Sequence, residues 1–534
     1  MKRLLQLTWI FVIGALVLAS CRKDDPPPPE VSPLLVSQYL VYDGLSLYYL
    51  WNEQMQGRTP TAANTNARTY FTSLLYRPTD RWSLITDDVD ALLRNFAGGE
   101  SARAFGFAPY VLWFDRARTR LVALVRYIYP GTPAAEVGLR RGDIIFEING
   151  RPITESNWRI FFDGTSQTTL TVYDQNFQNS RPVTITPRNF VANPVFHSSV
   201  DTIGDRVIGY LFYTAFRSGM PEYATAANNF NNDLFQVFRN FQQRGVTDLV
   251  LDLRYNPGGE VSTAIYLASL IAPRATVENQ EVFTTMNYNE DINESFDYQR
   301  IERTSRLGRF NDDLFQDPRL ANINPDGNLR VYILATRFSA SASELLIFGL
   351  RPFMGTNLIH IGEETAGKYT ASWTVHAFDN FFVGTGANRI ARAQRVHNES
   401  RFTEAEREVL RNWAMQPIVG TYTDRDGNDF VADGTLKPDF PTTEQELKQI
   451  DAFLHTPHLW QPIGNRNDYL FAKAISLITG QPRVAETRSV SGRRFIDAHL
   501  FSPQEQQLRR AVNVDNIEID PDMLREMLRS LNRK

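Results

Sequence analysis

The stretch RVYILATRFSASASELLIFGL, residues 330–350, places three serines where an apolar strand passes into an apolar helix. VYILA is typical of a buried strand, and ELLIFGL has the composition of a packed helix. Ser341 and Glu344 fit the S-x-x-E capping box, in which the serine side chain caps the helix. The N–H groups at a helix start can also stabilise an oxyanion, so a serine there can act as a nucleophile. Taken alone, the stretch favours capping.

A second turn of the same region carries paired glycines after another buried strand. LDLRYNPGGEV, residues 251–261, leads through Asn256–Gly259 into a predicted helix. Glycines at such a turn leave bare backbone N–H groups, which suit a developing negative charge. NPGG is also a good turn sequence in its own right, so both interpretations stay open.

Lysine is rare in this chain, and one lysine follows a third apolar strand. Only seven of the 56 basic residues are lysines, and Lys368 ends the stretch IHIGEETAGK, residues 359–368. A general base must give up its proton near neutral pH, which a desolvated lysine can do and an arginine cannot. Lys368 is therefore a candidate base, with an ordinary surface lysine as the alternative.

The N-terminus has the pattern of an export signal. Residues 1–21, MKRLLQLTWIFVIGALVLASC, combine a basic start with a short apolar run and small residues before Cys21, the only cysteine. LASC resembles a bacterial lipobox, which implies a lipid on Cys21 and a membrane tether for the mature chain. The proline-rich residues 22–32 predict a semi-rigid spacer. We expect a lipid-anchored outer-membrane lipoprotein, on either the periplasmic or the exterior face.

The rest of the chain, residues 33–534, divides into four predicted regions. The net charge of −4 for the whole 534-residue chain gives no indication of a nucleic-acid partner. Residues 33–100 predict a small helical domain, and 101–187 predict a strand-rich domain. Residues 188–450 alternate strands and helices, which is typical of α/β folds. Residues 451–534 are polar and are predicted to be a helical extension.

The strand-rich domain resembles a PDZ domain through GTPAAEVGLRRGDIIFEINGRPI, residues 131–153. PDZ domains bind an extended peptide by adding it as a strand to the sheet. The matching carboxylate-binding loop would contain Phe105, Gly106 and Phe107. The alternative is a PDZ-like fold that serves only as a spacer.

Taken together, the ordered stretches from about residue 40 to residue 445 resemble the C-terminal processing peptidases, also called tail-specific proteases. The resemblance rests on LDLRYNPGG, SASASE, GEETAGK and DGTLKPDF in this order. It implies a mixed α/β fold, with a crotonase-like peptidase core after a helical domain and a PDZ domain. It also implies that Ser341 is the nucleophile and Lys368 the general base. The oxyanion donors would be the N–H groups of Ala342 and of Gly258 or Gly259.

One position departs from the family pattern. Many members have a glutamine four residues after the lysine, where this chain has Ser372, a shorter possible orienting group. The implied reaction is hydrolysis of protein or peptide substrates through an acyl-enzyme, without a metal or organic cofactor.

Three other interpretations stay open. The chain could be a non-catalytic relative that only binds peptides, and Ser372 is the feature that keeps this alternative alive. An acyl-CoA enzyme of the crotonase-like fold is disfavoured by the export signal and the PDZ-like segment. The seven histidines also leave room for a Ser-His-Asp triad.

Overall fold

The computed structural model describes residues 31–77, 79–89, 100–114, 119–162, 166–174, 179–219, 229–294, 303–310, 315–378, 382–383, 390–391, 394–430, 434–442, 461–481 and 496–500. Cys21, the predicted export signal and most of the proline-rich spacer lie outside these residues.

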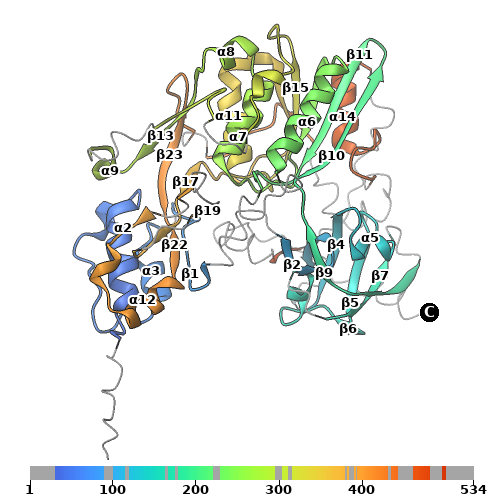
Figure 1. Ribbon diagram of the computed structural model, residues 1–534. Coiled ribbons are helices and arrows are strands. Elements are labelled where there is room, and N and C mark those ends of the chain that lie inside the picture. Colours follow the sequence, from blue (N-terminus) through green and yellow to red (C-terminus); the bar gives the residue numbers. More distant parts are fainter. Residues whose placement is uncertain are drawn as a thin grey trace, which may run out of the picture.

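A six-stranded sheet forms the centre of the peptidase-like region (Figure 1). Its strands are parallel from β11 to β24, and β10 pairs antiparallel with β11 at one edge. The inner strands are continuous apolar runs because both faces of the sheet are covered. In sheet order, the strands are β10 (Val195–Ile203), β11 (Arg206–Tyr213), β12 (Asp248–Asp252), β15 (Arg330–Ala335), β16 (Leu358–Gly362) and β24 (Phe440–Pro441).

Successive residues of the central strands pack on opposite faces of this sheet. Leu249 and Leu251 belong to the same buried cluster as residues of three helices, α6 (Phe230–Gln243), α7 (Val261–Ile271) and α11 (Ala342–Met354). Val250 packs on the other face, with α14 (Tyr469–Thr479) and with side chains of the PDZ-like region. The PDZ-like region is therefore joined to the central sheet through a shared apolar core.

The PDZ-like region is built around a seven-stranded sheet, and one of its strands was not expected. Residues 451–534 are predicted to be helical, but their described part contains both α14 and the strand β25, which pairs with β3. The strands are β25 (Ile496–Leu500), β3 (Phe107–Trp113), β4 (Leu121–Ile128), β5 (Ile144–Ile148), β7 (Thr168–Tyr173) and β8 (Ser180–Ile185), with β6 (Arg151–Pro152) paired to β5. Helices α5 (Pro133–Glu136) and η3 (Trp158–Phe161) and the pair β2 (Glu100–Ala104) and β9 (Arg188–Val191) complete it.

The N-terminal helical region is not made from one continuous segment. Its strand β1 (Leu84–Thr86) pairs with β22 (Ala414–Gln416), so residues far along the chain complete its core. Figure 1 shows the blue N-terminal helices beside the orange segment that contains α12. The other elements are η1 (Ser37–Tyr42), α2 (Asp43–Tyr48), η2 (Asn52–Met55), α3 (Ala67–Leu74), β18 (Val375–His376), β21 (Gln394–Arg395), η8 (Glu399–Arg401) and α12 (Glu404–Arg411).

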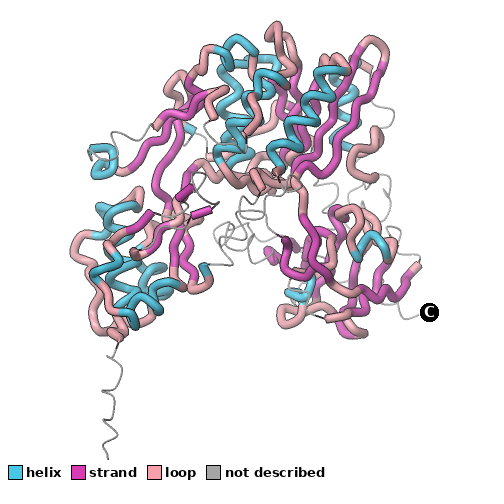
Figure 2. The backbone as a smooth tube through the Cα atoms, in the orientation of Figure 1, coloured by secondary structure: helices cyan, strands magenta, loops and turns pink. Residues whose placement is uncertain are grey.

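A four-stranded sheet connects the N-terminal region to the central one, as the long magenta strands of Figure 2 show. Its order is β14 (Thr304–Arg306), β13 (Val282–Tyr288), β23 (Ile418–Asp424) and β17 (Thr370–Ser372). The short elements are β19 (Phe382–Val383), β20 (Ile390–Ala391), α8 (Arg274–Glu278), α9 (Glu290–Glu294), η5 (Pro318–Leu320) and η6 (Gly355–Asn357).

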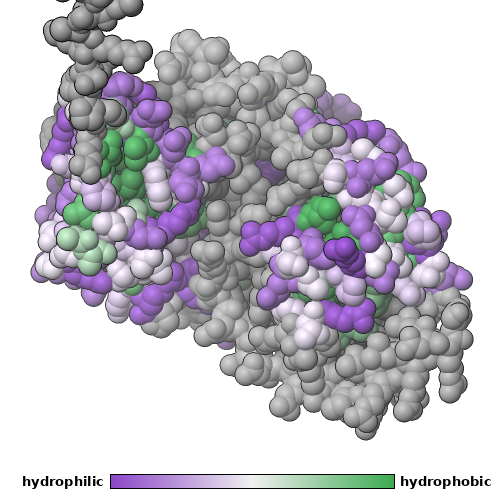
Figure 3. All heavy atoms as spheres, turned by 90° about the horizontal axis from the view of Figure 1, so that it is seen from below, coloured by the Kyte–Doolittle hydropathy of each residue, from purple (hydrophilic) through white to green (hydrophobic). Residues whose placement is uncertain are grey.

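The surface seen in Figure 3 is mostly hydrophilic over its coloured parts. Hydrophobic residues form two separate groups there, one on the N-terminal region and one on the PDZ-like region. Among the helices of the described ranges, none is both long enough and apolar enough to span a bilayer.

Candidate active site

Two strand–turn–helix units lie side by side and bring the predicted site residues together. β12 leads through the NPGG turn into α7, and β15 leads through the three-serine turn into α11. Because β12 and β15 are parallel neighbours, both turns lie at the same edge of the sheet. The Ala340 N–H donates to the Asn256 carbonyl at 3.1 Å, and the Leu253 N–H donates to the Leu334 carbonyl at 2.8 Å. The two turns therefore form one hydrogen-bonded unit.

The three serines have different roles in this unit. The Ser339 hydroxyl accepts from the Thr336 N–H at 2.9 Å and donates to the Leu253 carbonyl at 2.8 Å. The Ser343 hydroxyl donates to the Asn256 carbonyl at 2.9 Å. Both side chains are buried, whereas Ser341 is half-buried and its hydroxyl has no hydrogen-bond partner in the described residues. Ser339 and Ser343 therefore shape the turn, and of the three serines only Ser341 has a hydroxyl available for chemistry.

Ser341 is held in an unusual backbone conformation. Its φ of 56° and ψ of −114° lie outside the regions that a side-chain-bearing residue normally adopts. Such strain persists only where the surroundings impose it, and it is common at functional sites. Here Glu344 helps to impose it, since its Oε2 accepts the Ser341 N–H at 2.8 Å. The helix start thus has the predicted capping box, in which the Glu344 carboxylate accepts the Ser341 N–H.

Gly258 lies directly against the serine turn. A Cβ atom at this position would lie 2.6 Å from the Ala340 oxygen, 2.7 Å from the Ser341 Cβ and 2.8 Å from the Ala342 nitrogen. Only glycine permits this approach, and its φ of 98° also favours glycine.

The predicted oxyanion donors differ in whether their N–H groups are engaged. The Gly258 N–H donates to Asn256 Oδ1 at 2.8 Å. The N–H groups of Gly259 and Ala342 have no partner within the described ranges. Two of the three predicted donors are therefore open to a ligand.

One buried carboxylate joins the serine turn to the lysine loop. Glu344 Oε2 accepts both the Ser341 N–H and the Lys368 N–H, the latter at 2.9 Å, and Oε1 accepts the Gly367 N–H at 2.7 Å. Burial raises the pKa of the Glu344 carboxyl group. Ser341 and Lys368 are thus brought together through backbone contacts with a single oxygen atom.

Burial of the Lys368 ammonium group favours its neutral form. Burial lowers the pKa of Lys368 from 10.5 to about 8, while the carboxylates of Glu344 and Asp80 act in the opposite direction. The Nζ atom lies 5.7 Å from the centroid of the Trp82 ring, which is itself buried. A lysine with a pKa near 8 is partly neutral at physiological pH, as a general base requires.

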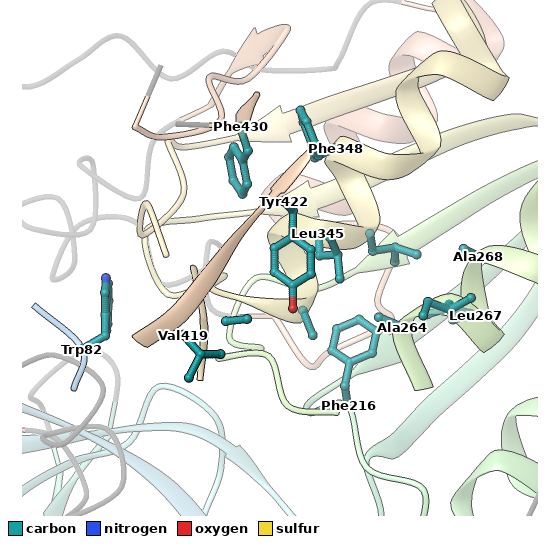
Figure 4. Close-up of a cluster of buried hydrophobic side chains, with 14 of the residues drawn as sticks. Trp82, Phe216, Ala264, Leu267, Ala268, Leu345, Phe348, Val419, Tyr422 and Phe430 are labelled. Atoms are coloured by element: carbon teal, nitrogen blue, oxygen red, sulfur yellow. The ribbon is translucent and has the colours of Figure 1, made fainter. Parts of the chain in front are cut away.

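Sequence reasoning did not find Asp80 or Trp82, which come from the N-terminal region. Asp80 is fixed by the Tyr49 hydroxyl at 2.7 Å and by the N–H groups of Trp82 and Ser83 at 3.0 and 2.9 Å. Figure 4 shows Trp82 on a chain segment separate from those that carry Leu345 and Val419. No motif in this stretch signals a role, because its position beside Lys368 depends on long-range packing.

Two other sets of predicted site residues are Ser372 and residues 105–107, and neither forms a described hydrogen bond with Lys368. Ser372 is half-buried at the end of β17, opposite Ile418, and no hydrogen bond joins it to Lys368 in the described residues. The Phe105 carbonyl accepts the Ala134 N–H at 2.8 Å, and the Gly106 carbonyl accepts the Tyr129 N–H at 2.9 Å. The side chains of Phe105 and Phe107 are buried in the core of the PDZ-like region. The orienting role of Ser372 and the peptide-binding role of residues 105–107 stay predictions.

The described residues contain no group of three or more histidine, cysteine or carboxylate side chains suited to holding a metal ion. Comparison with known proteins identifies three regions of the chain. Residues 207–441 match peptidase family S41, residues 38–84 match the peptidase S41 N-terminal domain, and residues 124–172 match a PDZ domain.

Two curated relatives are named carboxyl-terminal-processing protease. The one from Picosynechococcus sp. is 25% identical over 244 residues, which are 45% of this chain and 49% of the relative. The one from Synechocystis sp. is 24% identical over 243 residues, which are 45% of this chain and 47% of the relative. The chain thus spans about half the length of the curated relatives it matches.

A solved structure described as an S41 protease from Bacteroides fragilis supports the fold. It superimposes with a TM-score of 0.59 at 24% identity, covering 85% of this chain and all of that one. The mixed α/β class, with a peptidase core, a PDZ domain and a small N-terminal domain, is confirmed. With its three matched regions in this order, the chain is similar to peptidases of family S41 that carry an N-terminal domain and a PDZ domain.

Proposed function

We propose that the chain is a serine endopeptidase in which Ser341 is the nucleophile and Lys368 the general base. The observation that supports this most is the Glu344 carboxylate, which binds the backbone N–H groups of both residues. It is reinforced by the free Ser341 hydroxyl and by the lowered pKa of Lys368. The alternative base would be a histidine, but the described hydrogen bonds of Ser341 include none to histidine.

The reaction would proceed by acyl transfer. Neutral Lys368 accepts the Ser341 hydroxyl proton as the serine oxygen attacks the peptide carbonyl carbon. The resulting oxyanion accepts hydrogen bonds from the N–H groups of Ala342 and Gly259, which are free in the described structure. Collapse of this intermediate breaks the C–N bond, and protonated Lys368 returns the proton to the leaving amine. Water then attacks the acyl-enzyme, again with Lys368 as the base, and releases the acid product.

The substrate class follows from the PDZ domain and from the names of the relatives. We infer that the substrates are proteins or peptides, cleaved near their C-termini, with the PDZ domain engaging an extended segment. The N-terminal sequence supports export and lipidation at Cys21, which would hold the enzyme at the outer membrane.

The function can be tested with the chain lacking its first 21 residues and an unfolded substrate such as casein. Wild type, Ser341→Ala and Lys368→Ala are compared by gel electrophoresis and by release of soluble peptides. We expect cleavage by the wild type alone. Loss of cleavage only in Ser341→Ala would indicate a base other than Lys368. A fluorophosphonate probe adds a second readout, since labelling of wild type but not of Ser341→Ala would show a reactive serine.

A non-catalytic peptide-binding relative remains the second candidate. It would show no cleavage and no probe labelling in the wild type, while still binding peptides. The hydrogen bonds from the Ser341 and Lys368 N–H groups to Glu344 would then only stabilise the local fold.

A further inference from the structure

The strand β3 lies where a PDZ domain would accept an added strand, and a late segment of the chain already occupies it. β3 begins at Phe107, directly after the turn at Gly106, and pairs along its length with β4. On its other side it pairs antiparallel with β25, residues 496–500. Without β25, β3 would be an edge strand of this sheet.

The direction of β25 matches that of a bound peptide. Ile496 lies opposite Trp113, Asp497 opposite Leu112 and Leu500 opposite Val111. The segment therefore runs along β3 toward the turn at Gly106. An extended peptide that adds to a sheet edge gains its affinity from the same main-chain hydrogen bonds.

We propose that residues 496–500 are an internal ligand of the PDZ domain and occupy the β3 edge that an extended peptide must use. A peptide supplied in trans would have to displace β25 before it could pair with β3. The partner is thus any extended polypeptide segment, bound mainly through its backbone, and the chain's own segment is its competitor.

The rest of the sheet does not depend on this segment. β3 is held by its full-length pairing with β4, and the strand includes Pro109, which lacks an N–H group. Proline within a sheet is found mainly on edge strands, so β3 has the character of an edge that can exist unpaired. An edge of this kind is a ready template for another strand.

β25 belongs to the same chain as the PDZ domain, and this covalent link lets a short strand compete with a free peptide. It follows α14, which packs on β12, β15 and β16 and whose N-cap residue Asp468 forms a buried ion pair with Arg254 at 2.6 Å. In the sequence, only residues 480–495 separate this anchored helix from β25. A tether of this length gives an effective concentration on the order of millimolar, which a free peptide must overcome.

β3 contacts the segment just before the serine turn through Tyr110, so the strand that pairs with β3 can influence this turn. Tyr110 on β3 accepts a hydrogen bond from Arg337 Nη2 at 2.6 Å, and its ring lies 5.3 Å from that of Phe338. Both partners precede Ser339 in the serine turn. Any effect of β25 on catalysis rests on the proposed function, whereas its competition with peptides does not.

The experiment measures binding in a background that cannot cleave. The protein is the chain lacking its first 21 residues and carrying Ser341→Ala, and the probe is a fluorescein-labelled peptide of residues 492–502, GRRFIDAHLFS. Asp497→Pro is added to weaken β25, because Asp497 pairs with Leu112 of β3 and proline removes its N–H group and disfavours strand pairing. Asp497→Thr is the matched control, since threonine favours a strand. Fluorescence anisotropy gives the Kd of the probe for each protein.

We expect the probe to bind the Asp497→Pro protein about tenfold or more tightly than the parent or the Asp497→Thr control. The same peptide with proline at the position of Asp497 should bind none of them tightly. Equal affinity in all three proteins, or equal binding of the proline peptide, would overturn the proposal.

A second variant covers the case in which Asp497→Pro does not fold. The chain ending at Gln481 lacks β25 altogether, and circular dichroism checks that it is folded. It should bind the probe at least as tightly as the Asp497→Pro protein. If this shortened chain is folded and binds the probe no better than the parent, the proposal is wrong. Absence of casein cleavage by the wild type would affect the proposed function alone.

Discussion

The turns that follow β12 and β15 connect the same kinds of elements, but they differ in what they provide to the site. Each joins a parallel strand to a helix, and each contains a residue with a positive φ angle. In the NPGG turn these are glycines, and their missing side chains let the chain approach its neighbour closely. In the serine turn the residue is Ser341, which carries a hydroxyl with no partner among the described residues. One turn provides space and N–H groups, and the other provides the reactive group, so neither is sufficient alone.

The largest effect should come from filling the space that Gly258 leaves. Gly258→Ala would place a methyl group within 2.6–2.8 Å of Ala340, Ser341 and Ala342, and would force the serine turn to move. We expect peptidase activity to fall by more than about 100-fold, because the shift would misplace both the Ser341 hydroxyl and the Ala342 N–H. The initial rate of casein cleavage measures it.

Gly327→Ala is the matched control for this change. Its φ of 74° is also positive, but an added Cβ atom would meet only Pro273, at 3.9 Å. This variant should therefore lose about 1 kcal/mol of stability and little activity. Similar activity in the two alanine variants would show that the close approach of Gly258 to the serine turn is not required for activity.

Ser339 and Ser343 should contribute more to the free energy of unfolding than Ser341 does. Ser339→Ala removes two buried hydrogen bonds and Ser343→Ala removes one, so each should lower the free energy of unfolding by about 1–3 kcal/mol, Ser339→Ala the more. Ser341→Ala loses no hydrogen bond of its hydroxyl and should change stability by less than about 0.5 kcal/mol. Denaturant unfolding of the three variants measures these differences. A loss in Ser341→Ala as large as in Ser339→Ala would contradict the assignment.

A third region, the N-terminal one, should affect the pKa of Lys368, the proposed base. Cleavage requires neutral Lys368, so the rate should rise with pH through about 8, the pKa of this group. Asp80 raises the pKa of Lys368, so Asp80→Asn should move the midpoint of the rate–pH profile to lower pH. Asparagine keeps an oxygen for the N–H groups of Trp82 and Ser83, which preserves the local fold. An unchanged midpoint, or one at higher pH, would argue that Asp80 does not act on Lys368.

The smallest effect is expected at Ser372. Its hydroxyl has no described hydrogen bond to Lys368, so Ser372→Ala should change the rate by less than about twofold, within the scatter of surface substitutions. Ser372→Gln places the residue usual in the family at this position and provides the comparison. A tenfold loss in Ser372→Ala would restore the predicted orienting role.

Much of the site could be predicted because it lies in short, ordered stretches of sequence. The strand, the serine turn and the helix of residues 330–350 are encoded locally, and so is the glycine turn of residues 256–259. Lys368 stands out because most of the basic residues of the chain are arginines. These features depend on which residues are adjacent in the chain, and the sequence shows that directly.

Tertiary structure decided which partners complete the site. Asp80 and Trp82 reach Lys368 only because β1 of the N-terminal region pairs with β22, more than 300 residues later in the chain. The same holds for β25, whose residues look unremarkable in sequence until they pair with β3. Sequence alone indicated the proposed nucleophile and base and the order of the domains. The surroundings that lower the pKa of Lys368, and the occupant of the β3 edge, arise from contacts between distant segments, because burial and strand pairing are properties of the folded chain.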